Sequence, residues 1–119
     1  MKVAVNRCYG GFELSEIAVR RMATLGNKEA KKRVDEYDDR VAHPEKMDSI
    51  ERKYGPKLYG FLWETPRNDP VLIRVIEEIG VEAAGNMSEI ELVEIPDGTD
   101  FEIEEYDGKE WVSERHRTW

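Results

Sequence analysis

The residues best suited to bind a ligand gather in the C-terminal segment 114–119. Arginine offers a two-pronged guanidinium for a phosphate or a carboxylate, and tryptophan offers a flat face on which a nucleobase can stack. Arg115, Arg117 and Trp119 therefore form a set that suits a nucleotide. The alternative is structural: the two arginines neutralise neighbouring carboxylates, while Trp119 closes an edge of the core. Arg67, just ahead of an expected helix, has the same two interpretations.

A second candidate site lies where an expected strand ends at Gly10-Gly11. Glycines let backbone amides approach an anion, the N-terminus of a following helix adds a positive field, and Arg7 could supply a countercharge. The sequence has neither the dinucleotide-binding fingerprint nor the phosphate-binding loop motif, and Glu13 and Glu16 oppose an anion. A plain tight turn is therefore the simpler interpretation of the two glycines.

Catalytic chemistry has little support in the residues. Cys8 and His116 are the minimum for a cysteine nucleophile, but nothing in the sequence brings them together, and a cysteine ending a strand is commonly a small buried hydrophobic residue. An alternative small cytosolic enzyme would need this pair, or carboxylates such as Glu102 and Glu104, to converge in a pocket. Because His43 and His116 are isolated and the carboxylates lack calcium-loop spacing, we expect no metal, no cofactor and no enzymatic activity.

Acidic residues dominate the segment 89–110, which holds 10 Asp and Glu against a single lysine, Lys109. Glu102 and Glu104 alternate with apolar residues, so the segment can be read as the solvated face of a sheet. It can also be read as a surface that imitates the phosphates of DNA or attracts a basic partner. The sequence leaves both interpretations open.

The composition indicates one small globular domain spanning residues 1–119. The chain is 39% apolar and 37% charged, which allows a single core with a sheet and two or three helices. A formal charge of −8 argues against direct nucleic-acid binding and against binding to anionic membranes. One cysteine cannot form an internal disulfide, which fits a reducing cytoplasm. We expect no signal peptide, because only a short apolar-leaning run of about five residues follows Lys2, and no membrane span, because no run of about 18 apolar residues occurs.

Periodicity and turn signals predict an α+β fold in which two core helices cover one face of a mostly antiparallel sheet. Ser15 and Asp69 are expected N-caps, and Pro70 suits the first position of a helix. Asp107-Gly108 is a strong hairpin signal. The sheet is expected to combine the N-terminal strand with a C-terminal meander of three strands. The expected elements are strand 2–8, helix 16–25, helix 70–79, strand 90–95, and short strands around 101–103 and 111–112.

Residues 27–64 are predicted to form a charged helical insertion, with helices around 28–40 and 45–54. The run 58–63 is either a strand or an irregular segment that carries aromatic residues into the core. Three tryptophans are more than one sheet face readily covers, so we expect a homo-oligomer, with the insertion as a candidate dimer arm. The predicted core contains Val3, Val5, Ile17, Met22, Leu72, Val75, Ile76, Ile79, Leu92, Ile95, Phe101 and Ile103.

Several motifs lie towards the two ends of the chain. They are Asn6-Arg7-Cys8-Tyr9-Gly10-Gly11-Phe12, Leu14-Ser15, Arg67-Asn68-Asp69-Pro70, Val93-Glu94-Ile95-Pro96-Asp97, Glu104-Glu105-Tyr106-Asp107-Gly108 and His116-Arg117-Thr118-Trp119. Together these motifs resemble a family of small, mostly uncharacterised proteins of tailed bacteriophages and prophages. The resemblance misses residues 27–64, so no role for the insertion follows from it, and it carries over no catalytic residue.

The resemblance implies an accessory protein that acts in the cytoplasm of the bacterial host against a defence system. In one mechanism a homo-oligomer sequesters a small nucleotide signal, such as a cyclic oligonucleotide or an ADP-ribose derivative. Its arginines would bind phosphates, and an aromatic ring would stack on a base. In the alternative mechanism the acidic surface binds a host protein directly, as a DNA mimic would. The candidate ligand-binding residues are Arg7, Tyr9, Arg67, Asn68, Arg115, Arg117 and Trp119.

Overall fold

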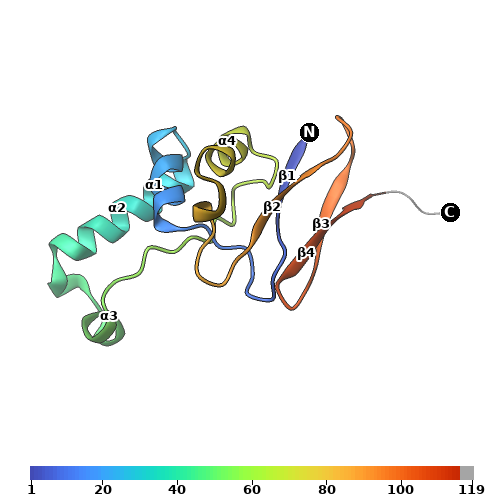
Figure 1. Ribbon diagram of the computed structural model, residues 1–119. Coiled ribbons are helices and arrows are strands. Elements are labelled where there is room, and N and C mark those ends of the chain that lie inside the picture. The colour runs from blue at the N-terminus through green and yellow to red at the C-terminus, as the bar shows by residue number, and fades with distance from the viewer. Residues whose placement is uncertain (116–119) are drawn as a thin grey trace.

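Two antiparallel strand pairs and four α-helices build the α+β fold that the sequence predicts (Figure 1). This computed structural model describes residues 1–115, and the counts refer to that range. The strands are β1 (Lys2–Asn6), β2 (Ile90–Glu94), β3 (Phe101–Tyr106) and β4 (Lys109–Glu114). The helices are α1 (Glu16–Thr24), α2 (Lys28–Ala42), α3 (Ser49–Tyr54) and α4 (Pro70–Ile79), with short 3-10 turns η1 (Pro44–Lys46) and η2 (Gly80–Ala83).

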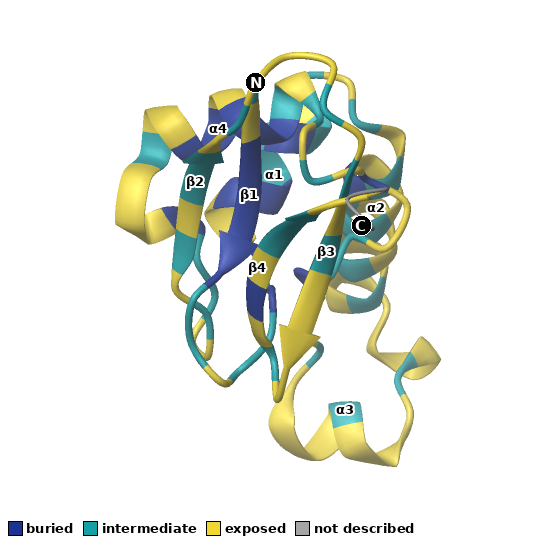
Figure 2. Ribbon diagram, turned by 90° about the vertical axis from the view of Figure 1, so that its right-hand side faces the viewer, coloured by how far each residue is buried: buried dark blue, intermediate teal, exposed yellow. Residues whose placement is uncertain are grey.

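The β1–β2 pair forms the middle of the molecule, with α1 and α4 on one side and the β3–β4 hairpin on the other (Figures 1 and 2). Its register runs from Lys2 opposite Glu94 to Asn6 opposite Ile90. Side chains alternate between the two faces of a strand, and Ala4 packs in the cluster formed with the helices. Val3 and Val5 therefore point to the opposite face, and both are fully buried.

The hairpin β3–β4 confirms the turn predicted at Asp107-Gly108, where both residues adopt positive φ angles of 54° and 91°. The expected continuous sheet is divided, however: β2 pairs with β1, and β3 pairs with β4. The segment between β2 and β3 explains the division. Pro96 has no N–H to donate to a ladder, and the chain turns there, with the Thr99 N–H donating to the Pro96 carbonyl over 3.2 Å.

The two core helices begin at the predicted caps. The Ser15 side chain accepts from the Ala18 N–H, and the Asp69 carboxylate accepts from the N–H groups at the start of α4. The prediction that Ile17 is a core residue is wrong: it is 57% exposed, because α1 turns Ala18, Val19 and Met22 inward instead. Six of the predicted core residues are buried, namely Val3, Val5, Met22, Leu72, Val75 and Ile76, whereas Ile79, Leu92, Ile95, Phe101 and Ile103 are half-buried.

Residues 27–64, the expected insertion, contain the helical elements α2, η1 and α3. The first part of α2 packs on α1 through the buried Ala30, and the far part carries α3 away from the rest of the molecule (Figure 1). The run 58–63 returns as an irregular segment, where the Leu14 N–H donates to the Gly60 carbonyl. Within residues 1–115, no helix has the length and apolar character needed to cross a membrane.

Candidate functional site

A groove of about 440 Å³ lies between the end of β2 and β4 and is the candidate ligand site. We call it the strand groove. The separation of the two strand pairs creates it, because β4 contacts β1 but is not hydrogen-bonded to β2. Apolar residues supply most of its wall, as is usual for small-molecule sites. The lining residues are Arg7, Val93, Ile95, Pro96, Thr99, Trp111, Val112 and Glu114.

Arg7 is the cation of the strand groove and is held there from two sides. Its Nε donates to Glu91 over 3.0 Å, and its Nη1 donates to the Glu110 carbonyl over 3.2 Å. These bonds use two of the five N–H donors of a guanidinium. The side chain is about one third exposed, so a ligand oxygen in the groove can reach the remaining donors.

Trp111 brings an aromatic surface to the same groove and is a candidate that the sequence interpretation missed. Its Nε1 donates to the Glu104 carboxylate over 2.8 Å, which fixes the ring on the hairpin, and 40% of the residue remains exposed. Val112 and Val93 add apolar surface nearby. An indole beside an apolar wall suits a flat heterocycle. The only sequence signal for this role of Trp111 is its cross-strand pairing with Glu104, which can be recognised only once the register of the hairpin is known.

Arg67, a predicted phosphate ligand, is instead engaged within the fold. Its two terminal nitrogens donate to the two carboxylate oxygens of Glu110 over 2.5 and 2.7 Å, and its guanidinium lies 3.8 Å from the centre of the Phe12 ring. Nη1 also donates to the Ala4 carbonyl. The side chain of Glu110 is only 9% exposed, so the pair is largely removed from water. A phosphate would have to displace this two-pronged contact.

The Arg67–Glu110 pair supplies hydrogen-bond partners for the edge of β1 that does not pair with β2. The edge N–H of Ala4 donates to the Arg67 carbonyl, and that of Asn6 donates to the Glu110 carboxylate, each over 2.8 Å. Polar groups on a strand edge need partners when they are buried. Arginine and glutamate therefore take the place that a neighbouring strand would occupy. One member of the acidic segment thus serves the fold, although most of the segment is exposed.

The Gly10-Gly11 loop is a close-packed turn, as the simpler interpretation expects. A Cβ on Gly10 would lie 1.7 Å from the Met87 carbonyl oxygen, and one on Gly108 would lie 2.6 Å from the Gly11 nitrogen. The buried Asn6 ties the same region together by donating to the carbonyls of Cys8 and Gly108, each over 2.7 Å. Space for an anion is therefore taken by the protein's own backbone.

The other predicted ligand residues are dispersed. Tyr9 is exposed, with the Lys109 ammonium 5.9 Å from its ring centre. Arg115 follows the groove residue Glu114, and its Nε lies 3.6 Å from Glu102. The structure therefore places Arg7 in the strand groove and Arg115 next in sequence to its lining, and it leaves Tyr9, Arg67 and Asn68 outside the lining. Arg117, Trp119 and the proposed catalytic partner His116 lie outside the described residues.

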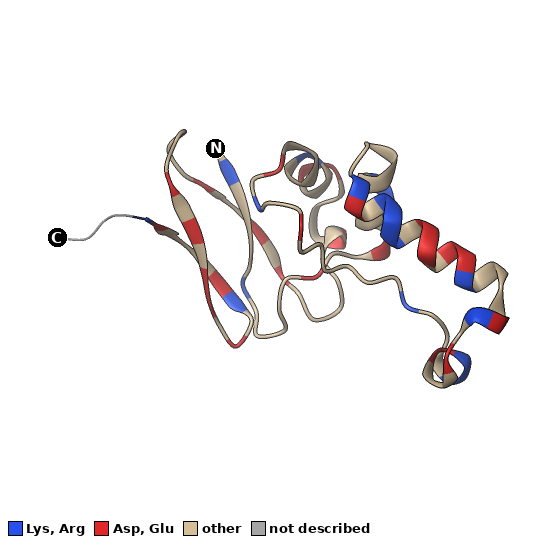
Figure 3. Cartoon of the chain, turned by 180° about the vertical axis from the view of Figure 1, so that it is seen from behind, with Lys and Arg blue, Asp and Glu red and all other residues tan. Residues whose placement is uncertain are grey.

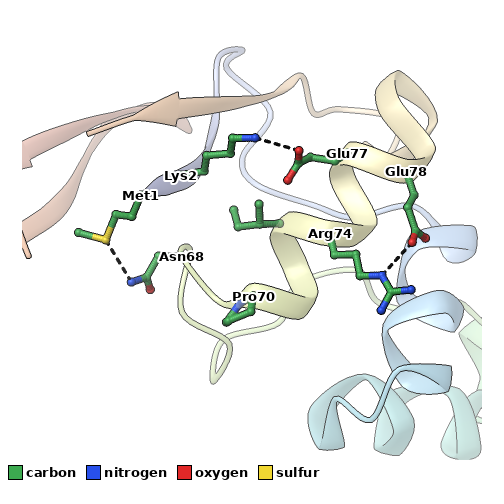
Figure 4. A pocket seen from close by; sticks show the side chains of 8 residues that line it. Met1, Lys2, Asn68, Pro70, Arg74, Glu77 and Glu78 are labelled. Atoms are coloured by element: carbon green, nitrogen blue, oxygen red, sulfur yellow. Dashed lines mark hydrogen bonds and ion pairs between the residues drawn. The ribbon is translucent and has the colours of Figure 1, made fainter. Parts of the chain in front are cut away.

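Asn68 lines a different pocket of about 570 Å³, between the start of β1 and α4 (Figure 4). The charges there are already matched: Lys2 donates to Glu77 over 2.8 Å, and Arg74 donates to Glu78 over 2.9 Å. Hydrogen bonds from Arg74 and Arg21 hold the pKa of Glu78 below its ordinary value. This pocket is larger than the strand groove but lacks an aromatic face, so it suits a nucleotide less well.

Metal and thiol chemistry gain no geometric support in the part of the chain that the structure describes. No group of three or more His, Cys, Asp and Glu side chains there is arranged to hold a metal ion. The Cys8 thiol lies 3.0 Å from the Met87 carbonyl and 3.3 Å from the Asn6 side-chain oxygen.

No protein-family model, curated protein or solved structure matches the chain.

Proposed function

We propose that the protein binds a small nucleotide-type ligand in the strand groove and sequesters it without transforming it. The observation that carries the proposal is that Arg7 and Trp111 line one groove with a largely apolar wall. A cation for a phosphate and an aromatic face for a base are the two contacts that a nucleotide needs. The groove volume of about 440 Å³ falls in the range of small-molecule sites.

In this proposal the base stacks on Trp111, and a phosphate accepts hydrogen bonds from Arg7. Arg115 can supply a second cation, because its present ion pairs are weak: Nε lies 3.9 Å from Asp100 and 3.6 Å from Glu102, and the side chain is half exposed. Glu114 also lines the groove.

The residues of the groove favour binding over catalysis. Acyl or phosphoryl transfer would need a nucleophile with a base that is oriented by a third group. The Thr99 hydroxyl donates to the Pro96 carbonyl over 2.6 Å, and Glu114 is the one carboxylate among the described lining residues. This set supplies no such relay.

A biological role follows from the resemblance to small phage proteins. A phage protein that holds a nucleotide signal of bacterial immunity keeps that signal from its effector. Such sequestration requires that the protein bind the signal tightly and be abundant in the cell, but it does not require that the protein convert the signal. We therefore assign the protein, within this proposal, an anti-defence role in the cytoplasm of the host.

Calorimetric titration with cyclic dinucleotides, cyclic trinucleotides and cyclic ADP-ribose isomers tests the proposal. The variants Arg7→Gln and Trp111→Ala should each weaken binding by about 10- to 100-fold, since a charged hydrogen bond contributes roughly 1.5–3 kcal/mol and a stacked base about 1–3 kcal/mol. Arg7→Lys should recover part of the affinity, because an ammonium lacks the two-pronged geometry. Trp111→Phe should likewise recover part of the stacking.

The matched control is Arg21→Gln, which also removes a surface arginine in an ion pair, here with Glu78, at the helical side of the molecule. Its affinity for the ligand should equal that of the parent. If the parent binds none of the nucleotides, or if Arg7→Gln and Trp111→Ala bind as tightly as the parent, the strand groove is not the site.

A further inference from the structure

The outer edge of β2, on the side away from β1, carries backbone groups without a partner among the described residues. Hydrogen-bonded and non-hydrogen-bonded pairs alternate along an antiparallel ladder, and at one end of this ladder the Arg7 N–H donates to the Glu89 carbonyl. The N–H and C=O groups of Ile90, Leu92 and Glu94 therefore point away from β1. Within residues 1–115, none of these outward groups takes part in a hydrogen bond.

The opposite edge of the same strand pair is closed. There the outward N–H groups of Ala4 and Asn6 donate to the Arg67 carbonyl and the Glu110 carboxylate. Figure 2 shows β2 on the outer side of β1, away from β4. The strand contains no proline and no lysine, two residues that often protect an edge strand from pairing. The outer edge of β2 is therefore able to accept an extended chain as an additional strand.

Apolar side chains flank this edge on both faces of the strand pair. Ile90 and Leu92 share a face with Ala4 and pack against the core, yet both are only half-buried. Val93 lies on the opposite face, is half-buried and lines the strand groove. An added strand would alternate its side chains between the same two faces and could cover all three residues. The outer edge of β3 offers less apolar surface, because four of its six residues are exposed and three of those four are acidic.

Carboxylates occupy other positions along the edge. Glu89 is exposed and forms no ion pair within residues 1–115. The side chains of Glu91 and Glu94 are 58% and 68% exposed, although each lies near one cation, Arg7 and the Met1 ammonium respectively. Figure 3 shows that most lysines and arginines lie on the helical side of the molecule. The edge therefore favours a strand that carries positive charges of its own.

We propose that the outer edge of β2 binds an extended basic segment of another protein, which adds to β2 as an antiparallel strand. Backbone hydrogen bonds would supply affinity, and the alternating side chains would select the partner. A second copy of β2 fits less well, because its own three carboxylates would lie beside those of the first copy. The proposal goes beyond the proposed function and needs no ligand in the strand groove. The segment should place cations opposite Glu89, Glu91 and Glu94, and apolar side chains opposite Ile90, Leu92 and Val93.

A synthetic peptide, acetyl-Val-Lys-Val-Val-Lys-Val-Lys-amide, carries this pattern when it runs antiparallel opposite residues 95 to 89. Fluorescence anisotropy of the dye-labelled peptide should show saturable binding to the parent protein. The second, fourth and sixth peptide residues would exchange backbone hydrogen bonds with Glu94, Leu92 and Ile90. N-methylation of these three residues removes the donors and should weaken binding at least about tenfold. N-methylation of the third and fifth residues, whose N–H groups would point away from β2, should change the affinity by less than about twofold.

A charge reversal in the protein tests the side-chain contacts. Glu89→Lys/Glu94→Lys should bind the unmodified peptide at least about tenfold more weakly than the parent, because attraction becomes repulsion. The matched control is Glu102→Lys/Glu105→Lys, which makes the same charge change on β3 and should bind the peptide like the parent. A thermal melt shows that each variant is folded.

Three results would overturn the proposal. The first is a parent that does not bind the peptide, and the second is an equal loss of affinity from the two N-methylation patterns. The third is a β3 variant that binds as weakly as the β2 variant, which would show that net charge alone attracts the peptide. Sedimentation equilibrium adds a check, since a parent dimer that the β2 variant dissociates would assign the edge to a second copy instead.

Discussion

Breaking the Arg67–Glu110 pair should destabilise the protein far more than breaking a surface ion pair. The variant Glu110→Gln keeps the shape of the side chain and an oxygen for the Asn6 N–H, so it removes mainly the negative charge. Arg67 then remains against Phe12 and the Ala4 carbonyl without its counterion. The substitution therefore measures how much the negative charge of Glu110, which bonds the edge of β1, contributes to stability.

The magnitude follows from burial and geometry. Removing one partner of a buried ion pair costs about 3–5 kcal/mol. The Arg67 side chain is still 22% exposed, against 9% for Glu110, so solvent screens part of the loss. We expect Glu110→Gln to lower the free energy of unfolding by about 2–4 kcal/mol. Because Arg67→Met removes the same contact, the double variant should lose about 1.5–3 kcal/mol less than the sum of the single losses.

Urea unfolding followed by tryptophan fluorescence measures these losses. With a slope of about 2 kcal/mol per molar, a loss of 3 kcal/mol moves the midpoint by about 1.5 M. The control is Glu77→Gln, whose exposed pair with Lys2 should contribute less than about 1 kcal/mol. Additive single losses, or a loss for Glu110→Gln no larger than for Glu77→Gln, would refute the edge-closing role of the pair.

Three further predictions concern the fold. Gly60→Ala should destabilise it by more than about 1 kcal/mol in urea titration, since the new Cβ would lie 1.8 Å from the Leu14 carbonyl oxygen; a neutral change would contradict this close approach. Ile76→Ala should cost about 2–4 kcal/mol, and a loss within error would contradict the assigned face of α4. Hydrogen bonds from Arg20 lower the pKa of Asp38 in the folded protein, so the ionised Asp38 carboxylate stabilises the fold above the ordinary carboxyl pKa. This stabilisation is lost as the pH falls through the lowered pKa. Asp38→Asn should therefore make the free energy of unfolding depend less on pH between pH 6 and 2.

Local signals were enough to predict the elements of the fold. Asp69-Pro70 starts α4 because a carboxylate cap and a fixed φ act within one turn, and Asp107-Gly108 closes the hairpin because both residues accept positive φ. These interactions involve neighbours in sequence. The periodicity failed at Ile17, where the face of α1 that is buried depends on which elements pack against it.

The candidate site was harder to predict because its contacts are distant in sequence. Glu110 appears in the sequence as one more carboxylate of an acidic strand, yet it meets Arg67 from 43 residues away and becomes buried. Arg67 was consequently expected at a phosphate. Trp111 joins Arg7 only because β4 contacts β1, a contact that no periodicity reports. Residue type predicted the chemistry, whereas tertiary contacts decide which residues are available for it.

We propose that the strand groove holds a nucleotide-type ligand and leaves it chemically unchanged. Native purification from bacteria expressing the protein, followed by denaturation and mass spectrometry of the released small molecules, tests it most directly. We predict a phosphate-containing nucleotide from the parent, with the mass of the signal present in the cell, and its loss from the Arg7→Gln/Trp111→Ala variant. Release of no nucleotide from a parent that was purified in cells producing such signals, equal release from the variant, or release of a chemically altered nucleotide would contradict sequestration in this groove.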